Sequence, residues 1–198
     1  PWTLYRYMSG NVLAGNIDEF DGAYMMTRLV DYIVEHLSQQ IKAGCDTVQV
    51  FDSWASDLGE EHIIPYCYEP TAQIVERLRA LHPDVGIIVF PRLIGEEINN
   101  FSKYVNADCI SLSDDMKTDW ILKRMGHQCL QGGIPPQVLL SEHREDILRG
   151  TVPMIRQMKD CAYVVNLAHG INKETPVENV RFFIEIVKRN RENITRET

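Results

Sequence analysis

Short runs of β-branched and aliphatic residues alternate along the chain with longer segments in which apolar residues recur every three or four positions. Each short run ends in polar residues, glycine or proline, as expected of a buried strand followed by a turn. The pattern predicts five strands, at residues 46–54, 85–92, 108–115, 128–136 and 163–170.

The longer segments have the periodicity of amphipathic helices. The clearest apolar stripe consists of Leu29, Val30, Ile33, Val34, Leu37 and Ile41. Lys42 and Gly44 predict the end of that helix, with a cation in its last turn and glycine at the C′ position. Further helices are predicted at 74–81, 95–105, 117–125, 144–159 and 177–190.

The last helix has a start signal of its own. Thr175 is predicted to be its N-cap and Pro176 its first residue. Glu178 then lies where a capping box needs a carboxylate, so we expect Thr175 and Glu178 to satisfy the first N–H groups of this helix.

Repeated strand–helix units without hairpin signals predict a parallel α/β sheet covered by helices on both faces. No G-x-G-x-x-G follows a strand, so the dinucleotide-binding form of an open sheet lacks its fingerprint. Five units in 198 residues match the last five of a (β/α)₈ barrel, forming a single domain over residues 1–198. Since the chain begins with Pro1, we expect three units upstream.

The composition narrows the function classes. A net charge of −8 argues against nucleic acid as a partner. No apolar run is long enough to cross a membrane and no signal segment precedes the first helix, which makes the cytoplasm the default location. Five scattered cysteines without a CxxC pair predict reduced thiols. His127 and Cys129 have H-x-C spacing, but a zinc site needs three or four converging ligands, so no metal site is predicted.

Ligands of parallel α/β proteins bind at the carboxyl ends of the strands. Asp52, Ser53, Arg92 and His169 all fall at such ends, and their side chains can form hydrogen bonds or transfer protons. Asp52 and Ser53 are equally compatible with simply capping a turn. No Ser/His/Asp spacing demands a catalytic triad.

Five motifs at these strand ends resemble the uroporphyrinogen decarboxylase family, in the family's order. PWTLYRYM is similar to its PWTL-x-x-YM segment, FDSWASDLG to FDSWAG, and FPRLIG to FPRG. LQGGIPP is similar to LQGN-x-DP, and NLAHGINKETPVENV to NLGHG…P-x-E-x-V. The chain departs from the family at Gly133 and Pro135, and Ser111-Leu112-Ser113-Asp114 stands where GLDW is usual.

The resemblance implies a (β/α)₈ barrel, usually a homodimer, that removes carbon dioxide from the four acetate side chains of uroporphyrinogen in haem biosynthesis. It implies no metal and no organic cofactor. It assigns Tyr7, Ser53 and His169 to the catalytic site, and with the strand-end pattern it suggests Asp52, Arg92 and Gly170 as substrate-binding residues. Gly170 is expected to let the chain turn there.

The family's main arginines, and the aspartate that binds the pyrrole N–H groups, belong to its N-terminal portion. We therefore expect that residues 1–198 alone do not decarboxylate the substrate, and that the chain extends upstream or pairs through an edge strand. Two alternatives stay open. One is a zinc- and cobamide-dependent methyltransferase of the same superfamily, although its H-x-C pair is replaced by Phe90-Pro91-Arg92. The other is a diverged homologue that binds a tetrapyrrole without turnover.

Overall fold

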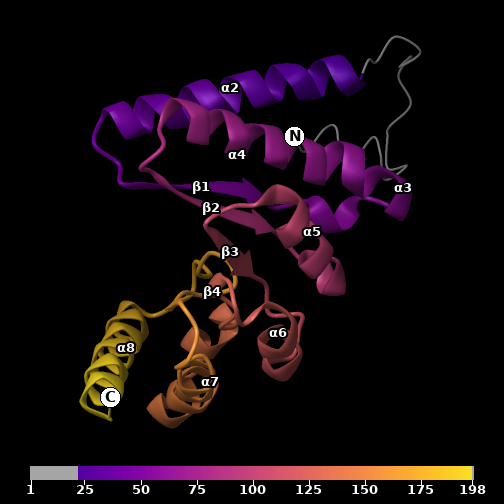
Figure 1. Ribbon diagram of the computed structural model, residues 1–198. Coiled ribbons are helices and arrows are strands. Elements are labelled where there is room, and N and C mark those ends of the chain that lie inside the picture. The colour runs from indigo at the N-terminus through magenta and orange to yellow at the C-terminus, as the bar shows by residue number, and fades with distance from the viewer. Residues whose placement is uncertain (1–21, 198) are drawn as a thin grey trace. The chain divides into compact units, whose positions relative to one another are not determined.

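Five parallel strands alternate with helices in a computed structural model that describes residues 22–197 (Figure 1). The chain forms two compact units, the first ending at Ile110 and the second beginning at Ser111. The described strand pairings are all parallel. The predicted parallel α/β class is therefore confirmed. None of the helices in this part of the chain has the length and apolarity needed to cross a membrane.

The first unit holds three strands and the helices that cover them. Its elements are α2 (Gly22–Lys42), β1 (Thr47–Asp52), η1 (Ala55–Asp57), α3 (Glu60–Ile63), η2 (Ile64–Tyr68), α4 (Glu69–Leu81), β2 (Gly86–Pro91), η3 (Gly95–Glu97), α5 (Ile98–Val105) and the start of β3 (Cys109–Leu112). β1 pairs with β2 from Thr47↔Gly86 to Asp52↔Pro91. Alternate residues of both strands, among them Val48 and Ile87, are buried in the core of this unit.

α2 packs against α4 along the first unit (Figure 1). Val30, Val34 and Leu37 are its buried apolar residues, while Leu29 and Ile33 are only partly buried, so the apolar stripe that faces the core is narrower than the sequence suggests. The helix ends as predicted. Gly44 has φ 109°, its N–H bonds the carbonyl of Ile41, and the next N–H bonds that of Gln40, which is a Schellman motif.

The amino ends of the strands in this unit are held by a salt bridge. The Asp108 carboxylate accepts the Ile87 N–H at 2.8 Å and pairs with the Arg79 guanidinium at 3.1 Å. These contacts join α4, β2 and β3 at the end opposite to the one where ligands bind in parallel sheets. We therefore assign Arg79 to stability.

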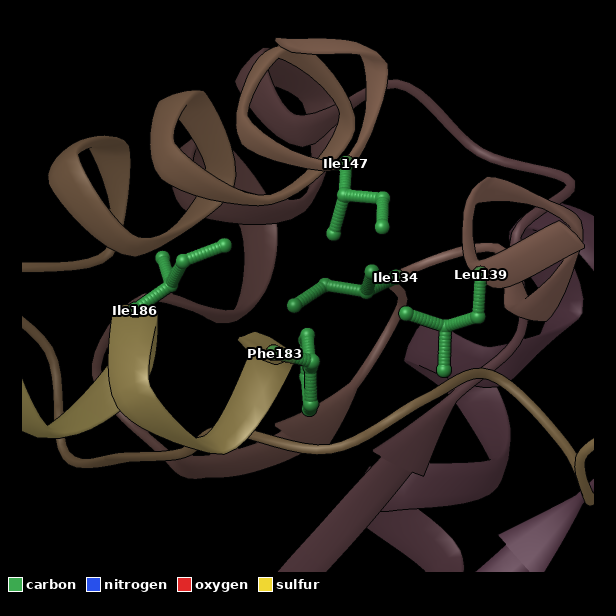
Figure 2. Close-up of a cluster of buried hydrophobic side chains, with 5 residues drawn as sticks. All are labelled: Ile134, Leu139, Ile147, Phe183 and Ile186. Carbon is green, nitrogen blue, oxygen red and sulfur yellow. The ribbon is translucent and has the colours of Figure 1, made fainter. Parts of the chain in front are cut away.

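The second unit contains the end of β3 and the remaining elements. They are α6 (Thr118–Met125), β4 (Cys129–Gly132), η4 (Pro136–Leu140), α7 (Arg144–Gln157), β5 (Tyr163–Val164) and α8 (Val177–Glu197). Figure 2 shows the side chains of its core cluster pointing toward one another. The cluster consists of Ile134, Leu139, Ile147, Phe183 and Ile186, which come from the loop after β4 and from η4, α7 and α8.

The predicted strands are all present, but each is shorter than the segment for which it was predicted. β5 has two residues in place of the predicted eight. Its pairing with the preceding strand resumes at an isolated bridge between Ile134 and Leu167. The interruption lies at Gly132 and Gly133, which have φ values of 81° and 86° and bend the backbone out of the regular ladder.

The predicted capping box at the start of α8 is wrong. The carbonyl of Pro176 accepts the N–H of Val180, so the helix begins at Val177, as the predicted range 177–190 has it but one residue later than the capping box requires. The Thr175 hydroxyl is buried without a hydrogen-bond partner, and Glu178 pairs with Arg181 instead. Thr175 is thus one residue too far from the helix to serve as its cap.

Candidate functional site

The carboxyl ends of β1 and β2 lie side by side in the first unit. Asp52 is in register with Pro91, and the next residue, Arg92, donates its backbone N–H to the carbonyl of Asp52 at 3.0 Å. Asp52, Ser53 and Arg92, which the sequence singled out, are therefore neighbours. Tyr7 lies outside the described residues.

Asp52 continues the alternation of β1 on the side of Val48 and Val50, the face that carries the buried side chains. There its carboxylate accepts a hydrogen bond from the thiol of Cys67. Burial raises the pKa of that thiol, and the charge of Asp52 and this hydrogen bond raise it further. Cys67 is therefore a protonated, unreactive thiol that helps to hold Asp52 in place.

Ser53 and Arg92 are more open than Asp52. Ser53 is exposed and Arg92 is half-buried. Within residues 22–197, the Arg92 guanidinium makes no ion pair and no side-chain hydrogen bond. A cation without a partner at a strand end is suited to bind a carboxylate, because no existing salt bridge has to be broken.

A cavity of about 270 Å³ opens at the end of β1. Its lining is mainly apolar and comes from α2, β1 and α4, with Asp52, Ser53, Tyr66 and Thr71 as its polar members. A cavity of this size, with few polar groups in an apolar wall, has the general form of a small-molecule site.

The loop after β2 is fixed at both ends. Arg92 is bound through its N–H to Asp52, and five residues later Glu97 is bound by Tyr68 of η2. The Tyr68 hydroxyl lies 2.9 Å from a Glu97 carboxylate oxygen and 3.0 Å from the Glu97 carbonyl oxygen. Burial raises the pKa of the Tyr68 hydroxyl and the hydrogen bond to Glu97 raises it further, so it stays a donor.

Between these two anchors, Leu93 has a left-handed backbone with φ 57°. That conformation costs a non-glycine residue about 1–2 kcal/mol. The FPRG stretch that FPRLIG resembles has glycine at this position. The chain thus keeps a residue with a strained backbone next to Arg92.

We expect Leu93→Gly to be about 1 kcal/mol more stable than Leu93→Ala, because only glycine adopts this φ without strain. Both variants lose the same side-chain contacts, so their difference isolates the backbone term. Urea unfolding measures it. The matched pair is Glu76→Gly and Glu76→Ala in the middle of α4, where glycine should be less stable by about 1 kcal/mol. If the glycine variant were less stable than the alanine variant at position 93 as well as at position 76, Leu93 would not be strained.

A second cavity, of about 570 Å³, lies between the loops after β1 and β2. Leu58, Ile63, Ile64 and Ile94 give it apolar walls together with Leu93. Its polar members include Glu97 and Tyr68. Of the described residues that line it, none is a lysine or arginine, so its chemistry differs from that of the Arg92 side chain.

In the second unit His169 follows β5 and is partly buried. Its Nδ1 lies 2.9 Å from the carbonyl oxygen of Gly170. A carbonyl only accepts, so Nδ1 carries the proton and Nε2 is the acceptor of the neutral ring. Nε2 can therefore take up a proton, and once protonated it can donate to a carboxylate.

The chain bends at Ala168 and His169, as expected, but the bend does not require glycine at position 170. Gly170 is not among the residues with positive φ, and a Cβ built there meets no described atom within 4 Å. Neither the backbone nor its surroundings require glycine at this position. Glycine is required instead at Gly132, where φ is 81° and a Cβ would lie 2.9 Å from the carbonyl oxygen of Leu112.

Sequence reasoning missed a buried polar group at the carboxyl ends of β3 and β4. Gln131 is 4% exposed, and its Nε2 donates to the hydroxyl of Ser111 at 3.3 Å. Ser113 is also buried. The signal was present as polar residues inside apolar runs, but only the folded chain brings the Gln131 amide to the Ser111 hydroxyl.

His127 is exposed and Cys129 is partly buried. Over residues 22–197, no group of three or more His, Cys, Asp or Glu side chains converges as a metal site would require. The five cysteines are free.

Parallel βα units with polar side chains at the strand ends define an α/β protein of the kind that binds small molecules at that end of its sheet. The model of the uroporphyrinogen decarboxylase family matches residues 1–190. This chain belongs to that family. The predicted resemblance is confirmed, and the βα repeats fit the family's (β/α)₈ fold.

Among its relatives are uroporphyrinogen decarboxylases of three bacteria. That of Orientia tsutsugamushi is 32% identical over 200 residues, that of Paracoccus denitrificans 30% over 200, and that of Cereibacter sphaeroides 29% over 199. Each alignment covers 95% of this chain and 58% of the relative. The chain thus spans well under two thirds of the length of these relatives.

Proposed function

We propose that this chain forms part of an enzyme that decarboxylates the four acetate side chains of uroporphyrinogen to give coproporphyrinogen. The family match over residues 1–190 carries this proposal. Three relatives that cover 95% of the chain are named for this activity.

The chemistry needs a polyanion site and a supply of protons. Protonation of a pyrrole carbon next to the acetate makes the ring an electron sink. The bond to the carboxylate carbon then breaks, carbon dioxide leaves, and the electron pair of that bond neutralises the ring by forming a double bond between the ring and the side-chain carbon. A proton finally replaces the lost carboxylate on the side chain, and the proton added to the ring is released. Each cycle therefore consumes one proton and releases one carbon dioxide, so the protein has to orient the acetate and move protons.

The described residues suit these tasks. Arg92 offers a carboxylate a guanidinium that has no partner among residues 22–197, and Ser53 offers an exposed hydroxyl beside it. The Nε2 atom of His169 can accept a proton and return it. We assign Ser53, His169 and Tyr7 to the catalytic group, and Arg92, Asp52 and Gly170 to substrate binding. Asp52 contributes through the position of its loop, since its carboxylate is bound to Cys67.

The test is an anaerobic assay of the product of the complete gene with uroporphyrinogen, with coproporphyrinogen measured by chromatography. We expect turnover in the wild type and a loss of about 100-fold in kcat for His169→Ala, the usual effect of removing an acid–base group. His143→Ala is the control, because His143 is exposed before α7 and lies outside the proposed site. Normal turnover by His169→Ala would contradict its role.

The alternatives give different results in the same assay. Tight binding of the substrate without product would favour the non-catalytic homologue, which the replacement of LQGN-x-DP by LQGGIPP motivates. Stoichiometric zinc and methyl transfer to a thiol would favour the methyltransferase. Assay of residues 1–198 by themselves tests the expectation that this part alone is inactive. A cytoplasmic homodimer acting in haem biosynthesis stays a prediction.

A further inference from the structure

η2, Ile64–Tyr68, is a turn of π-helix between α3 and α4. Such turns are rare and occur frequently at functional sites. Two consecutive residues of η2 bind carboxylates from different loops. The Cys67 thiol donates to Asp52, at the end of β1, and the Tyr68 hydroxyl donates to Glu97, in the loop after β2. One turn therefore connects the two loops of the first unit that carry candidate site residues.

The Tyr68 ring is held firmly enough to act as an anchor. Tyr68 is 3% exposed. Its ring makes an edge-to-face contact with Phe101 at 5.3 Å and a tilted contact with Tyr104 at 5.7 Å, both from α5. Asn100 of the same helix also donates to the Glu97 carboxylate. Because the Tyr68 ring is buried and packed against two other rings, its hydroxyl is suited to fix the position of Glu97.

Anchoring Glu97 restrains Arg92. Only four residues separate them, and one of these, Leu93, is already in a strained conformation. A strained residue persists only where its surroundings leave no alternative. On the two sides of Leu93, the Arg92 N–H bonds Asp52 and the Tyr68 hydroxyl bonds Glu97. We expect release of the contact between Tyr68 and Glu97 to let Leu93 relax and the Arg92 backbone move.

We propose that Tyr68 is a positioning residue that sets the place of the Arg92 guanidinium for a substrate carboxylate. The proposal rests on the proposed function, which assigns Arg92 to substrate binding. Tyr68 itself does not contact the substrate. It acts through Glu97 and the loop that joins Glu97 to Arg92.

The first test is a double-mutant cycle in the product of the complete gene. We expect Tyr68→Phe to raise KM for uroporphyrinogen about tenfold with kcat changed less than twofold, because it weakens binding and leaves the reacting groups alone. In an Arg92→Gln background the same substitution should have no further effect. Tyr104→Phe is the control, since Tyr104 shares the ring contacts and is 49% exposed. Additive effects of Tyr68→Phe and Arg92→Gln would overturn the proposal.

The second test does not depend on catalysis. Hydrogen exchange at the Arg92 amide, which bonds Asp52, should become at least fivefold faster in Tyr68→Phe and stay unchanged in Tyr104→Phe. Glu97→Ala, at an exposed position, removes the carboxylate contact and keeps the carbonyl contact, so it should speed this exchange less than Tyr68→Phe does. If the wild type has no decarboxylase activity, the proposed function fails and the exchange rates alone decide whether Tyr68 holds the loop. Unchanged exchange in both Tyr68→Phe and Glu97→Ala would overturn the proposal.

Discussion

Gly132→Ala is expected to lower the free energy of unfolding by about 3 kcal/mol. The left-handed backbone of Gly132, with φ 81°, strains any other residue by roughly 1–2 kcal/mol. An added Cβ would also lie 2.9 Å from the carbonyl oxygen of Leu112 and 3.2 Å from that of Leu167. Both are backbone atoms held in strand contacts, so relieving the clash adds about 1–3 kcal/mol.

Urea unfolding of three glycine variants checks this expectation. Gly170→Ala is the control, because Gly170 has open space around it and lacks a positive φ, and its stability should change by less than about 1 kcal/mol. Gly133→Ala should fall between the two. It shares the strained φ, but its Cβ would meet mainly the flexible end of the Met154 side chain. Equal losses for Gly132→Ala and Gly170→Ala would show that the bend after β4 does not depend on glycine.

Arg92→Gln is expected to lower kcat/KM for uroporphyrinogen about 100-fold, equivalent to roughly 2.7 kcal/mol, with little change in stability. A hydrogen bond between charged groups contributes about 1.5–3 kcal/mol. The guanidinium has no partner in the described part of the chain, and the Arg92 N–H keeps its bond to Asp52 in the variant. The free energy of unfolding therefore changes little, whereas the substrate carboxylate loses the cation that binds it.

Arg79→Gln is the matched control for Arg92→Gln. Arg79 pairs with Asp108 at the amino ends of the strands, so its replacement should lower stability slightly and leave turnover unchanged. Steady-state kinetics and urea unfolding of both variants separate the two roles. Equal turnover by Arg92→Gln and the wild type would remove Arg92 from the site.

Local signals in the sequence predicted the strands and most of the helices. The end of α2 is an example, because Gly44 alone provides the conformation that a Schellman motif needs. Thr175 shows the limit of such signals. Its motif is correct letter by letter, yet the helix begins one residue later and the hydroxyl is left without a partner. Helix ends depend on where tertiary packing stops the helix, which a local motif does not encode.

The strand-end rule placed Asp52, Ser53 and Arg92 in one neighbourhood, as β1 and β2 show. It could not supply the contacts that hold them. Tyr68 and Glu97 are 29 residues apart, and the bond between them depends on an added residue in a helical turn. Gly170 was selected from its motif, whereas the backbone demand for glycine lies at Gly132. These differences between the predicted and the observed site follow from φ angles and interatomic distances, which the pattern of residues along the sequence does not contain.

The π-turn at Ile64–Tyr68 makes the wall of the larger cavity sensitive to an insertion or deletion. Each residue of a helix advances the side chains by about 100° around its axis. Deletion of one residue just before Cys67 would leave Cys67 and Tyr68 in phase with α4 and rotate the preceding residues by that angle. Ile63 and Ile64 would then turn away from the cavity that they line. The shape of this cavity therefore depends on the number of residues in the π-turn. A protein with the same strand-end motifs and one residue fewer in this turn would have a cavity of different shape.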